Sequence, residues 1–368
     1  MGRNKLNKFL FFFDSRATFA YSNNVLKYFK KNQLNYKIFV SGNYLEKQMK
    51  IDKKIFSKNK LKISAKVKFE SPNNNISSWP KSFGKAMIGY AEKLSRLKPD
   101  LAIITGDRIE TLAFSITCAY MNIPIAHIQA GDKSGHIDDL SRAAISKFSN
   151  IHFAPSAEAC KRLISWGEDR NRIFFTGAPQ LDDINPDKSQ KKSDYYIVIF
   201  HPILNEQKYL NKHLNNLIAA INKTDINVIW IYPNNDVGYK KILNSLKKKN
   251  KNIKLVSNFE RTDFIKILKK SKGMIGNSSA GIIEASMLKI PVLNIGNRQN
   301  GRPQSKNIVN CKPNLKSIVR KIDYIKNNKS FLKSLEKVKN PFFIKGSSKK
   351  ITKILMNLEK GNKLLKKY

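Results

Sequence analysis

The chain has few cysteines, and their arrangement excludes two kinds of stabilised fold. Cys118, Cys160 and Cys311 are the three in 368 residues, so they are odd in number and far apart. This pattern matches neither a disulfide framework nor the close spacing of metal ligands. Cys118 lies in an apolar stretch, where a free thiol behaves as a small core side chain. We therefore expect no metal and a fold held by its hydrophobic core.

Long hydrophobic runs are also missing. The apolar run 9–13 is far shorter than the roughly 20 residues that a membrane-spanning helix needs. Residues 1–8 are basic, but Asp14 follows the apolar run too soon for the core of a signal peptide. We expect a cytoplasmic protein without an integral membrane segment.

Acidic residues are scarce, which leaves a formal net charge of +42. Such a charge suggests nucleic acid or an anionic surface as a partner. However, only 12 of the 69 basic residues are arginine, and the lysines are spread over helix faces rather than interleaved with aromatic side chains. We expect a solvated basic surface, no nucleic-acid partner, and a field that draws in an anionic substrate. A weak anionic-surface role is the first alternative, and nucleic-acid binding is the second.

The few arginines are placed unevenly along the chain. A planar guanidinium grips phosphate or carboxylate through two parallel hydrogen bonds, which a lysine does not do. Five arginines lie in glycine- and acid-rich segments rather than on the lysine-coated helices: Arg16, Arg108, Arg142, Arg298 and Arg302. Arg16 opens a helix after the first predicted strand, a position that suits an anion, although an ordinary surface arginine would look the same. We expect these arginines to face an anionic ligand.

Short β-type runs alternate with helical patterns along the chain, which is typical of a parallel, doubly wound sheet. Strands are predicted over residues 9–13, 36–40, 63–69, 101–105, 124–128, 151–154, 173–176, 195–200, 228–232, 253–257, 273–276 and 290–295. In the first half, helices are predicted over residues 18–30, 83–97, 110–121, 138–148 and 157–166.

The length suits two domains of roughly 150–200 residues. The polar segment 181–193 has no periodicity and is predicted to be a hinge. We expect an α/β protein with two Rossmann-like doubly wound domains, over 1–180 and 194–346, facing across a cleft. A terminal helix over 347–368 should pack back on the first domain, with a basic amphipathic membrane helix as the alternative.

Polar groups crowd the ends of two predicted strands in the first domain. Asp107 and Arg108 follow the run 101–105, and a glycine turn over 131–135 follows the run 124–128. In an open α/β sheet, residues just past the carboxyl ends of the strands meet the ligand. Asp107 could cap the next helix or transfer a proton. His136, beside the glycine turn, is a further candidate for lining this site.

Asp138 and Arg142 are four residues apart, so they share one face of the helix predicted over 138–148. An acidic first turn with a helix ion pair would account for them structurally. In the functional alternative, the carboxylate handles a proton while the guanidinium faces an anionic substrate.

The segment 276–284 carries the clearest local pattern of the second domain. A strand enters a serine- and glycine-rich turn that opens a helix, and such a turn can cradle a diphosphate. Glu284 could reach a ribose diol from that helix. No Gly-x-Gly-x-x-Gly or Walker lysine pattern is present, so NAD and ATP are disfavoured and no cofactor is expected. His201 lies before Pro202 at the end of another strand, facing the expected cleft.

Taken together, these segments resemble the UDP-N-acetylglucosamine 2-epimerase family, in particular its hydrolysing branch from sialic-acid and related nonulosonate synthesis. The matching pieces stand in family order, from near residue 15 to about residue 310. They are 15–18, 106–108, 127–131, 135–139 with Arg142, 177–182, 201–202, 276–279 with Gly281 and Glu284, and 296–302.

The resemblance implies the glycosyltransferase-B architecture, with the nucleotide held mainly by the second domain. It also implies that a proton leaves sugar C-2, UDP is expelled from C-1 to give an unsaturated glycal-type intermediate, and water adds to release free N-acetylmannosamine or an analogue. By motif position, the catalytic residues are Asp107, Asp138, Arg142 and His201, with the two aspartates as proton-transfer groups. The substrate-binding residues by the same reasoning are Arg16, Arg108, Gln129, Asp132, His136, Asn277, Ser278, Ser279, Gly281, Glu284, Arg298 and Arg302.

The chain departs from the family pattern at Gln129, where some members carry a glutamate assigned to proton transfer. Glutamine cannot titrate, so that role is absent or carried elsewhere, for instance by Asp132. The departure leaves the sugar open, and a UDP- or GDP-linked diacetamido sugar of the bacillosamine type is the alternative to UDP-N-acetylglucosamine. A glycosyltransferase of the same architecture and a non-enzymatic basic binding protein are the competing hypotheses. Dimers are usual in the family, so a homodimer or homotetramer is expected.

Overall fold

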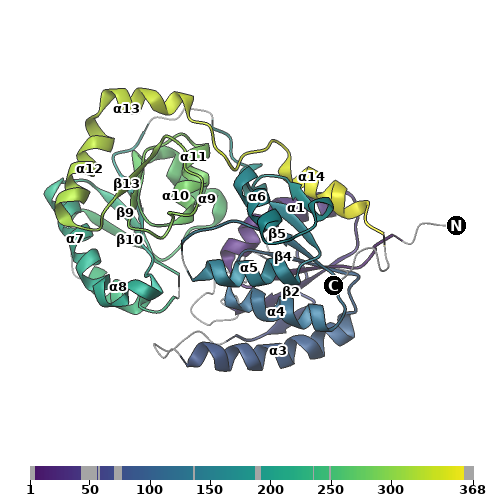
Figure 1. Ribbon diagram of the computed structural model, residues 1–368. Helices are drawn as coiled ribbons and strands as arrows, with labels where there is room; N and C mark the ends of the chain where they lie inside the picture. Colours follow the sequence, from purple (N-terminus) through teal and green to yellow (C-terminus); the bar gives the residue numbers. More distant parts are fainter. Residues whose placement is uncertain are drawn as a thin grey trace. The chain divides into compact units, whose positions relative to one another are not determined.

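The structure of the chain is a computed structural model that describes residues 5–42, 56, 59–69, 77–135, 137–186, 192–234, 236–247 and 250–359 (Figure 1). The chain forms two compact units. Unit 1 comprises Met1–Lys133, Ile137–Asp183 and Phe342–Tyr368, and unit 2 comprises Ser134–His136 and Ile184–Pro341. The chain therefore passes from one unit to the other four times.

Unit 1 is built on a parallel sheet that, within the described residues, has seven strands in the order β3-β2-β1-β4-β5-β6-β7. The strands are β1 (Phe9–Phe13), β2 (Tyr36–Ser41), β3 (Ala65–Val67), β4 (Leu101–Thr105), β5 (Ile125–Ile128), β6 (Ile151–Ala154) and β7 (Ile173–Phe175). The helices are α1 (Arg16–Lys31), α3 (Ser78–Leu97), α4 (Ile109–Tyr120), α5 (Asp138–Phe148), α6 (Ala157–Ser165) and α14 (Ser347–Met356), with short 3-10 turns η2 (Arg170–Arg172) and η3 (Pro179–Leu181).

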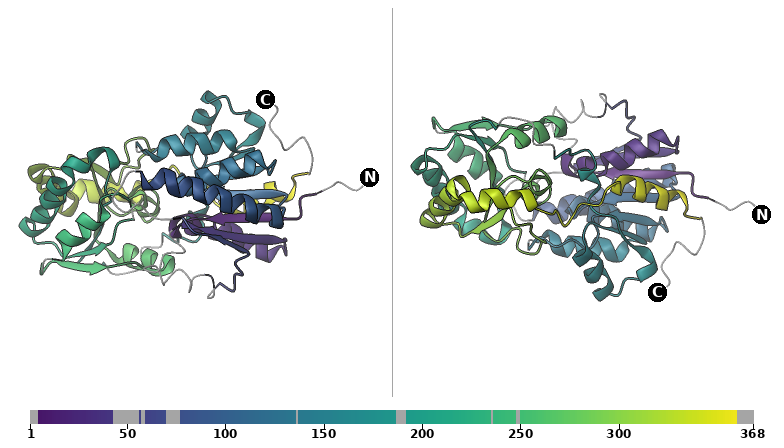
Figure 2. Two further views of the ribbon diagram at one scale, coloured as in Figure 1. Left: turned by 90° about the horizontal axis from the view of Figure 1, so that it is seen from below. Right: turned by 90° about the horizontal axis from the view of Figure 1, so that it is seen from above.

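Alternating side chains of the central strand divide the core of unit 1 into two layers. Phe9, Phe11 and Phe13 of β1 pack with α1 and α14 on one face of the sheet. Leu10 and Phe12 pack on the opposite face with α3, α4 and α5. A strand with apolar residues at every position is expected where both faces are covered by helices. Figure 2 shows the yellow α14 running beside the purple α1, with which it is in contact.

Unit 2 repeats the same design with six strands among the described residues, in the order β10-β9-β8-β11-β12-β13. The strands are β8 (Tyr196–Ile199), β9 (Val228–Ile231), β10 (Ile253–Val256), β11 (Gly273–Gly276), β12 (Val292–Ile295) and β13 (Ile308–Cys311). The helices are α7 (Leu210–Lys223), α8 (Tyr239–Leu246), α9 (Arg261–Lys270), α10 (Ser279–Ile282), α11 (Glu284–Met287), α12 (Leu315–Asn327) and α13 (Lys329–Ser334), with 3-10 turns η4 (Leu204–Tyr209) and η5 (Leu335–Lys337).

The predicted α/β class, with two Rossmann-like parallel sheets, is confirmed. The structure differs from the predicted elements at several places, and the terminal helix predicted over 347–368 ends at Met356. The strand predicted over 63–69 is limited to β3, the helical turn after β11 is split into α10 and α11 at Ile283, and β13 was not predicted. The strand has only four residues, interrupted by Asn310 and flanked by Asn307 and Lys312, which explains why its apolar run is too short to predict a strand. Part of the predicted hinge and residues 360–368 of the predicted terminal helix lie outside the described residues.

Candidate functional site

The strand order of unit 1 changes direction at β1, which pairs with β2 on one side and with β4 on the other. The loops after β1 and β4 therefore begin side by side at the carboxyl edge of the sheet. The Thr111 hydroxyl donates a 2.5 Å hydrogen bond to Asp14, joining the start of α4 to the loop after β1. Such a switch point is where open α/β sheets bind their ligands.

Asp107, on the loop after β4, is held by Arg142 of α5. The Arg142 Nη2 donates to Asp107 Oδ2, and the Arg142 side chain is only 2% exposed. Its Nη1 donates to Asp139 Oδ1 at 2.9 Å and to the Asp132 backbone carbonyl at 3.0 Å. The structure thus brings together three predicted residues and adds Asp139, which the sequence analysis missed.

Asp138, the other predicted proton-transfer residue, is the first residue of α5 and is half-buried. Arg142 pairs with Asp139, three residues before it on the helix, at 2.9 Å. Residues three and four apart share one helix face, so Asp139 belongs to the same face as Asp138 and Arg142.

Gln129 follows β5 in the left-handed backbone region, with φ of +64°, and its side chain is buried. Its Nε2 donates to Gln180 Oε1 at 3.2 Å. Both residues belong to segments that resemble the family motifs. A buried non-glycine residue in this conformation is uncommon and costs backbone energy.

His127 supports the neighbouring loop without being a candidate acid. Its Nε2 lies 2.8 Å from the Gly106 carbonyl, and its Nδ1 lies 3.2 Å from Ser146 Oγ. Burial lowers the pKa of His127 to about 3. The ring is therefore neutral at physiological pH and fixes the glycine that precedes Asp107.

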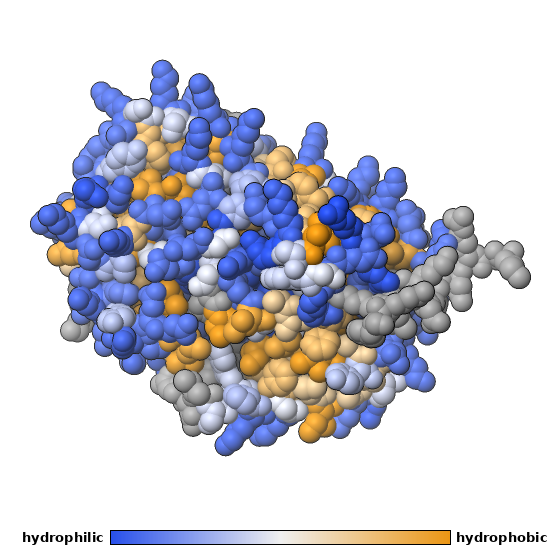
Figure 3. Space-filling view, viewed as in Figure 1, coloured by the Kyte–Doolittle hydropathy of each residue, from blue (hydrophilic) through white to orange (hydrophobic). Residues whose placement is uncertain are grey.

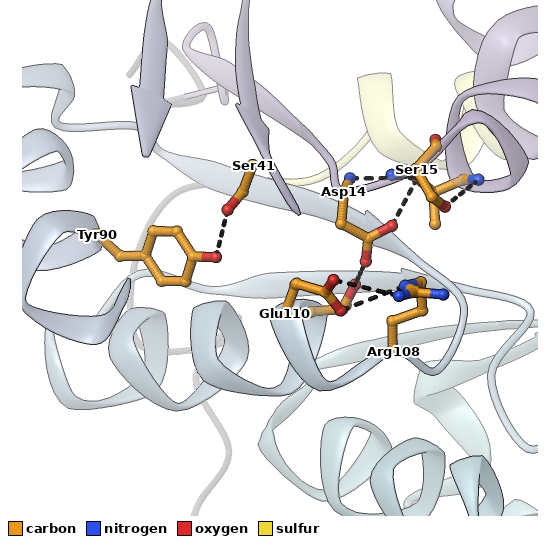
Figure 4. A network of polar contacts seen from close by, with 8 residues as sticks. Asp14, Ser15, Ser41, Tyr90, Arg108 and Glu110 are labelled. Atoms are coloured by element: carbon orange, nitrogen blue, oxygen red, sulfur yellow. Dashed lines mark hydrogen bonds and ion pairs between the residues drawn. The ribbon is translucent and has the colours of Figure 1, made fainter. Parts of the chain in front are cut away.

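Arg108 lies beside a buried carboxylate cluster at the same switch point (Figure 4). Its guanidinium pairs with Glu110, and Asp14 lies within the same network. Arg108 was predicted as a substrate contact, whereas Glu110 and Asp14 were not among the predicted site residues.

Unit 2 has its own switch point, where β8 pairs with β9 and with β11. His201 follows β8 and Asn277 follows β11, and the two are joined reciprocally. The His201 N–H donates to Asn277 Oδ1 at 2.7 Å, and Asn277 Nδ2 donates to the His201 carbonyl at 2.9 Å. The Asn234 N–H donates to His201 Nδ1 at 3.1 Å, so a neutral His201 carries its proton on Nε2.

The loop after β12, which we call the arginine loop (Gly296–Arg302), is anchored on Asn277. Arg298 Nη1 and Gln299 Nε2 both donate to the Asn277 carbonyl, at 3.2 and 2.9 Å. Arg302 Nη1 donates to Gln299 Oε1. Three predicted residues therefore share one network, and its centre is the fully buried Gln299, which the sequence analysis missed.

The predicted diphosphate turn has the expected glycine and serine geometry, although its helix is short. Gly276 has φ of +134°, and a Cβ there would lie 2.0 Å from the Ile199 carbonyl oxygen. Ser278 caps α10, which begins at Ser279 and has four residues. Gly281 is buried, and a Cβ on it would meet Val292 at 3.0 Å, so it serves close packing of α10 on β12.

Glu284 begins α11 and pairs with Arg261, the first residue of α9, at 3.3 Å. Both side chains are largely buried. Arg261 had no motif to mark it, because it lies on a lysine-rich helix of ordinary composition.

A cavity of about 690 Å³ opens in unit 2 beside the carboxyl ends of β12 and β13. Tyr209 and His213 flank it with stacked rings, and Lys212 and Lys312 give it a basic lining. The predicted site residues lie outside its lining.

Two predicted residues are beyond what the structure describes. His136 lies outside the described residues, and for Arg16 only the backbone is placed, at the start of α1. Among the described residues, no group of three or more His, Cys, Asp or Glu is positioned to hold a metal ion. No described helix is long and apolar enough to cross a membrane.

The chain is similar to known proteins of one family. A family model described as UDP-N-acetylglucosamine 2-epimerase matches residues 27–356. A UDP-N,N'-diacetylbacillosamine 2-epimerase (hydrolyzing) of Legionella pneumophila is 30% identical, over 83% of this chain and 85% of the relative. A UDP-N-acetylglucosamine 2-epimerase of Neisseria meningitidis is 36% identical, over 63% of this chain and 65% of the relative.

A solved structure is similar over nearly the whole chain. The crystal structure of Methanocaldococcus jannaschii UDP-GlcNAc 2-epimerase in complex with UDP-GlcNAc and UDP superposes with a TM-score of 0.80. The alignment covers 95% of this chain and 99% of that one, at 19% identity. At this identity the likeness establishes the shared fold.

Proposed function

The chain belongs to the UDP-N-acetylglucosamine 2-epimerase family, and from that premise we propose that it hydrolyses UDP-N-acetylglucosamine to UDP and N-acetylmannosamine. It is an enzyme that acts on UDP-sugars. The proton at C-2 is removed and UDP leaves, and water then adds to the unsaturated intermediate with inversion at C-2. The observation that carries this assignment is the buried Arg142 guanidinium against Asp107, on the loop after β4.

The two units supply different parts of this chemistry. In unit 1, Asp107 and Asp138 are the proposed proton-transfer groups, and the ion pair with Arg142 holds the Asp107 carboxylate in place. In unit 2, Ser278, Ser279 and Arg298 bind the leaving diphosphate. Such cationic and hydroxyl contacts matter most as negative charge grows on the leaving group.

The remaining site residues have supporting roles in the same proposal. His201 contacts the reacting sugar nucleotide through the ring that the Asn234 N–H orients. Glu284 binds the ribose and is kept in place by Arg261. The other proposed substrate contacts are Arg16, Arg108, Gln129, Asp132, His136, Asn277, Gly281 and Arg302.

The test is turnover in heavy water with the purified protein. We expect stoichiometric release of UDP and of N-acetylmannosamine that carries deuterium at C-2, seen by proton NMR. Product with protium at C-2 would refute the elimination mechanism. Transfer of the sugar to an added acceptor, with the C-2 hydrogen retained, would instead identify a glycosyltransferase.

The sugar is tested by a substrate panel, because relatives of two specificities match the chain. The Legionella relative is named for UDP-N,N'-diacetylbacillosamine, and the Neisseria relative is named for UDP-N-acetylglucosamine. We expect the highest kcat/KM with UDP-N-acetylglucosamine. A higher value with a UDP- or GDP-linked diacetamido sugar would reassign the substrate while leaving the reaction unchanged.

The released amino sugar is proposed to feed sialic-type nonulosonic acid synthesis in the cytoplasm. A polysialic acid biosynthesis protein of Escherichia coli is 28% identical over 71% of this chain. Deleting the gene should abolish nonulosonic acid in the host, and free N-acetylmannosamine in the medium should restore it. Failure of this rescue would contradict the proposed role in nonulosonic acid synthesis. Recovery of the protein with the membrane fraction would contradict the proposed cytoplasmic location.

The protein is also proposed to form a homodimer through the outer surface of α3, α4 and α5, which we call the apolar face. Tyr120, Leu140 and Ile88 are 84%, 70% and 66% exposed, the highest values among the large hydrophobic side chains of the described residues. They lie on three neighbouring helices, and Figure 3 shows apolar side chains gathered there. Helix α4 has no lysine or arginine, in a chain with a net charge of +42. Two such charged copies repel, so a second copy fits best where the contact is centred on α4, which has no basic residue.

Sedimentation velocity tests the dimer. We expect the wild type to sediment as a dimer at micromolar concentration and the double variant Tyr120→Lys/Leu140→Lys to sediment as a monomer. The matched control is Phe175→Lys, at a half-exposed position of β7 in the same unit, which should stay dimeric. A monomeric wild type, or a double variant that remains dimeric, would refute the proposed interface.

A further inference from the structure

Glu110 is a buried carboxylate that the proposed chemistry does not use. It lies in the first turn of α4 and is 3% exposed. Two nitrogens of the Arg108 guanidinium, Nε and Nη2, donate hydrogen bonds of 3.3 Å to its two carboxylate oxygens. Such paired contacts fix the plane of a guanidinium as well as its position.

A second carboxylate packs next to this pair but is satisfied in a different way. Asp14 is fully buried, and its two oxygens accept from the hydroxyls of Thr111, at 2.5 Å, and Thr18, at 3.1 Å (Figure 4). Neutral hydroxyls thus hold Asp14, whereas Glu110 is compensated by Arg108. The two carboxylates repel each other, which makes the guanidinium the main counter-charge of Glu110.

The backbone closes over these groups at Gly42. This residue has φ of +61°, and a Cβ on it would lie 2.7 Å from the Asp14 carbonyl oxygen and 3.1 Å from Glu110 Oε1. Only glycine fits here without displacing the carboxylate. Asp14 and Glu110 are thus enclosed near the end of β4, and the Arg108–Glu110 pair is not an ordinary surface ion pair.

We propose that Glu110 is the positioning residue for Arg108, holding its guanidinium ready to bind the diphosphate of the substrate. This inference rests on the proposed function, in which Arg108 is a substrate contact. The diphosphate is the anionic part of a UDP-sugar, and Arg108 immediately follows Asp107 at the switch point. Glu110 acts through Arg108 and touches no reacting atom.

Because Glu110 can take up a proton, the proposed role predicts that KM depends on pH. Burial raises the pKa of Glu110 from its usual 4.5, Arg108 opposes the rise, and Asp14 adds to it. As the pH falls from 7 toward 4.5, a proton on Glu110 would release the guanidinium. KM should therefore rise on the acid side in the wild type, and Glu110→Gln should flatten that part of the profile.

The decisive experiment is a double-variant cycle on KM. Glu110→Gln should raise KM about tenfold and change kcat less than twofold, since one charge-assisted pair is lost. If Glu110 acts through Arg108, Glu110→Gln should have no further effect in an Arg108→Ala background. Multiplicative effects of the two changes, or a fall in kcat at unchanged KM, would overturn the proposal. The matched control is Glu92→Gln on the exposed side of α3, which should leave KM unchanged.

Binding of UDP alone separates this proposal from the proposed reaction. Calorimetric titration needs no turnover, so the cycle can be repeated on the Kd for UDP even if the sugar product differs from expectation. A wild type that releases no UDP from any sugar nucleotide would refute the function and leave the positioning role testable. Equal affinity of wild type and Glu110→Gln for UDP would refute the positioning role itself.

Thermal unfolding of each variant identifies any that fails to fold. Glu110→Asp keeps the charge but shortens the reach, so its KM should fall between those of the wild type and Glu110→Gln.

Discussion

Removing the amide of Asn277 should both destabilise unit 2 and lower activity. The side chain is fully buried and makes two reciprocal hydrogen bonds with the backbone N–H and carbonyl of His201. Asn277→Ala leaves both backbone groups buried without these partners. An unsatisfied buried group costs about 1–3 kcal/mol, so the free energy of unfolding should fall by about 2–6 kcal/mol.

The assay is urea unfolding followed by tryptophan fluorescence, because Trp230 lies in the core of unit 2. Asn277→Asp provides a second comparison, since it can accept from the His201 N–H but places an oxygen against the His201 carbonyl. It should lose at least as much stability as Asn277→Ala, because it also buries a carboxylate against a carbonyl. The matched control is Asn327→Ala on exposed α12, which should change stability by less than about 0.5 kcal/mol. A change of less than 1 kcal/mol for Asn277→Ala would refute the view that this amide joins the two loops.

Asn277→Ala should also lower activity, for a reason separate from its effect on stability. The Asn277 carbonyl anchors the arginine loop through Arg298 and Gln299. Under conditions where the variant stays folded, kcat/KM should still fall at least about tenfold, because donors for the leaving diphosphate are no longer fixed. Full activity in folded Asn277→Ala would show that the hydrogen bonds of Asn277 stabilise the unit without positioning the diphosphate donors.

Three further predictions concern other parts of the two switch points. Arg142→Met should lose more than about a hundredfold in kcat and about 3–5 kcal/mol in stability, because it leaves Asp107 and Asp139 without their buried partner; retained activity would remove Asp107 from the mechanism. Gly276→Ala should cost about 2–6 kcal/mol from the 2.0 Å approach to Ile199 and the positive φ, whereas Gly346→Ala, with open space around it, should cost only about 1–2 kcal/mol; equal losses in urea unfolding would contradict the steric argument. His127 has a pKa of about 3 when folded and about 6.5 when unfolded, so the unfolded chain takes up the extra proton and stability should fall as the pH drops from 6.5 toward 3, by up to about 1.4 kcal/mol per unit; a His127→Asn variant that keeps the same slope would refute this assignment.

The sequence predicted the sheets well where burial shapes the composition. The run at β1 is apolar at every position because both its faces are covered, and its length and flanks identified it as a strand. By contrast, β13 is half-exposed and short, and Asn310 interrupts its apolar residues, so no periodic pattern marks it. The split between α10 and α11 depends on the backbone at Ile283, which no residue pattern marks.

The site was predictable in its motifs but not in its contacts. Asp107 and Arg142 were both identified, because each lies in a polar segment where a core position would be apolar. Their direct pairing joins a loop to a helix 35 residues later, and only the packing of α5 on the sheet brings them together. Gln299 and Glu110 were missed because an amide between two arginines and a glutamate in a helix first turn are ordinary in sequence, and only burial makes them unusual.

The four passages of the chain between the units have a consequence for synthesis. The core of unit 1 includes Ile351 and Leu355 of α14, which follow the whole of unit 2 in the sequence. Because the ribosome delivers residues in order, the segment Ile184–Pro341 is available to fold before the face of α1 that receives α14 is covered. Nascent unit 1 would then wait with an apolar surface open, and a chaperone that binds the growing chain should be needed there rather than at unit 2.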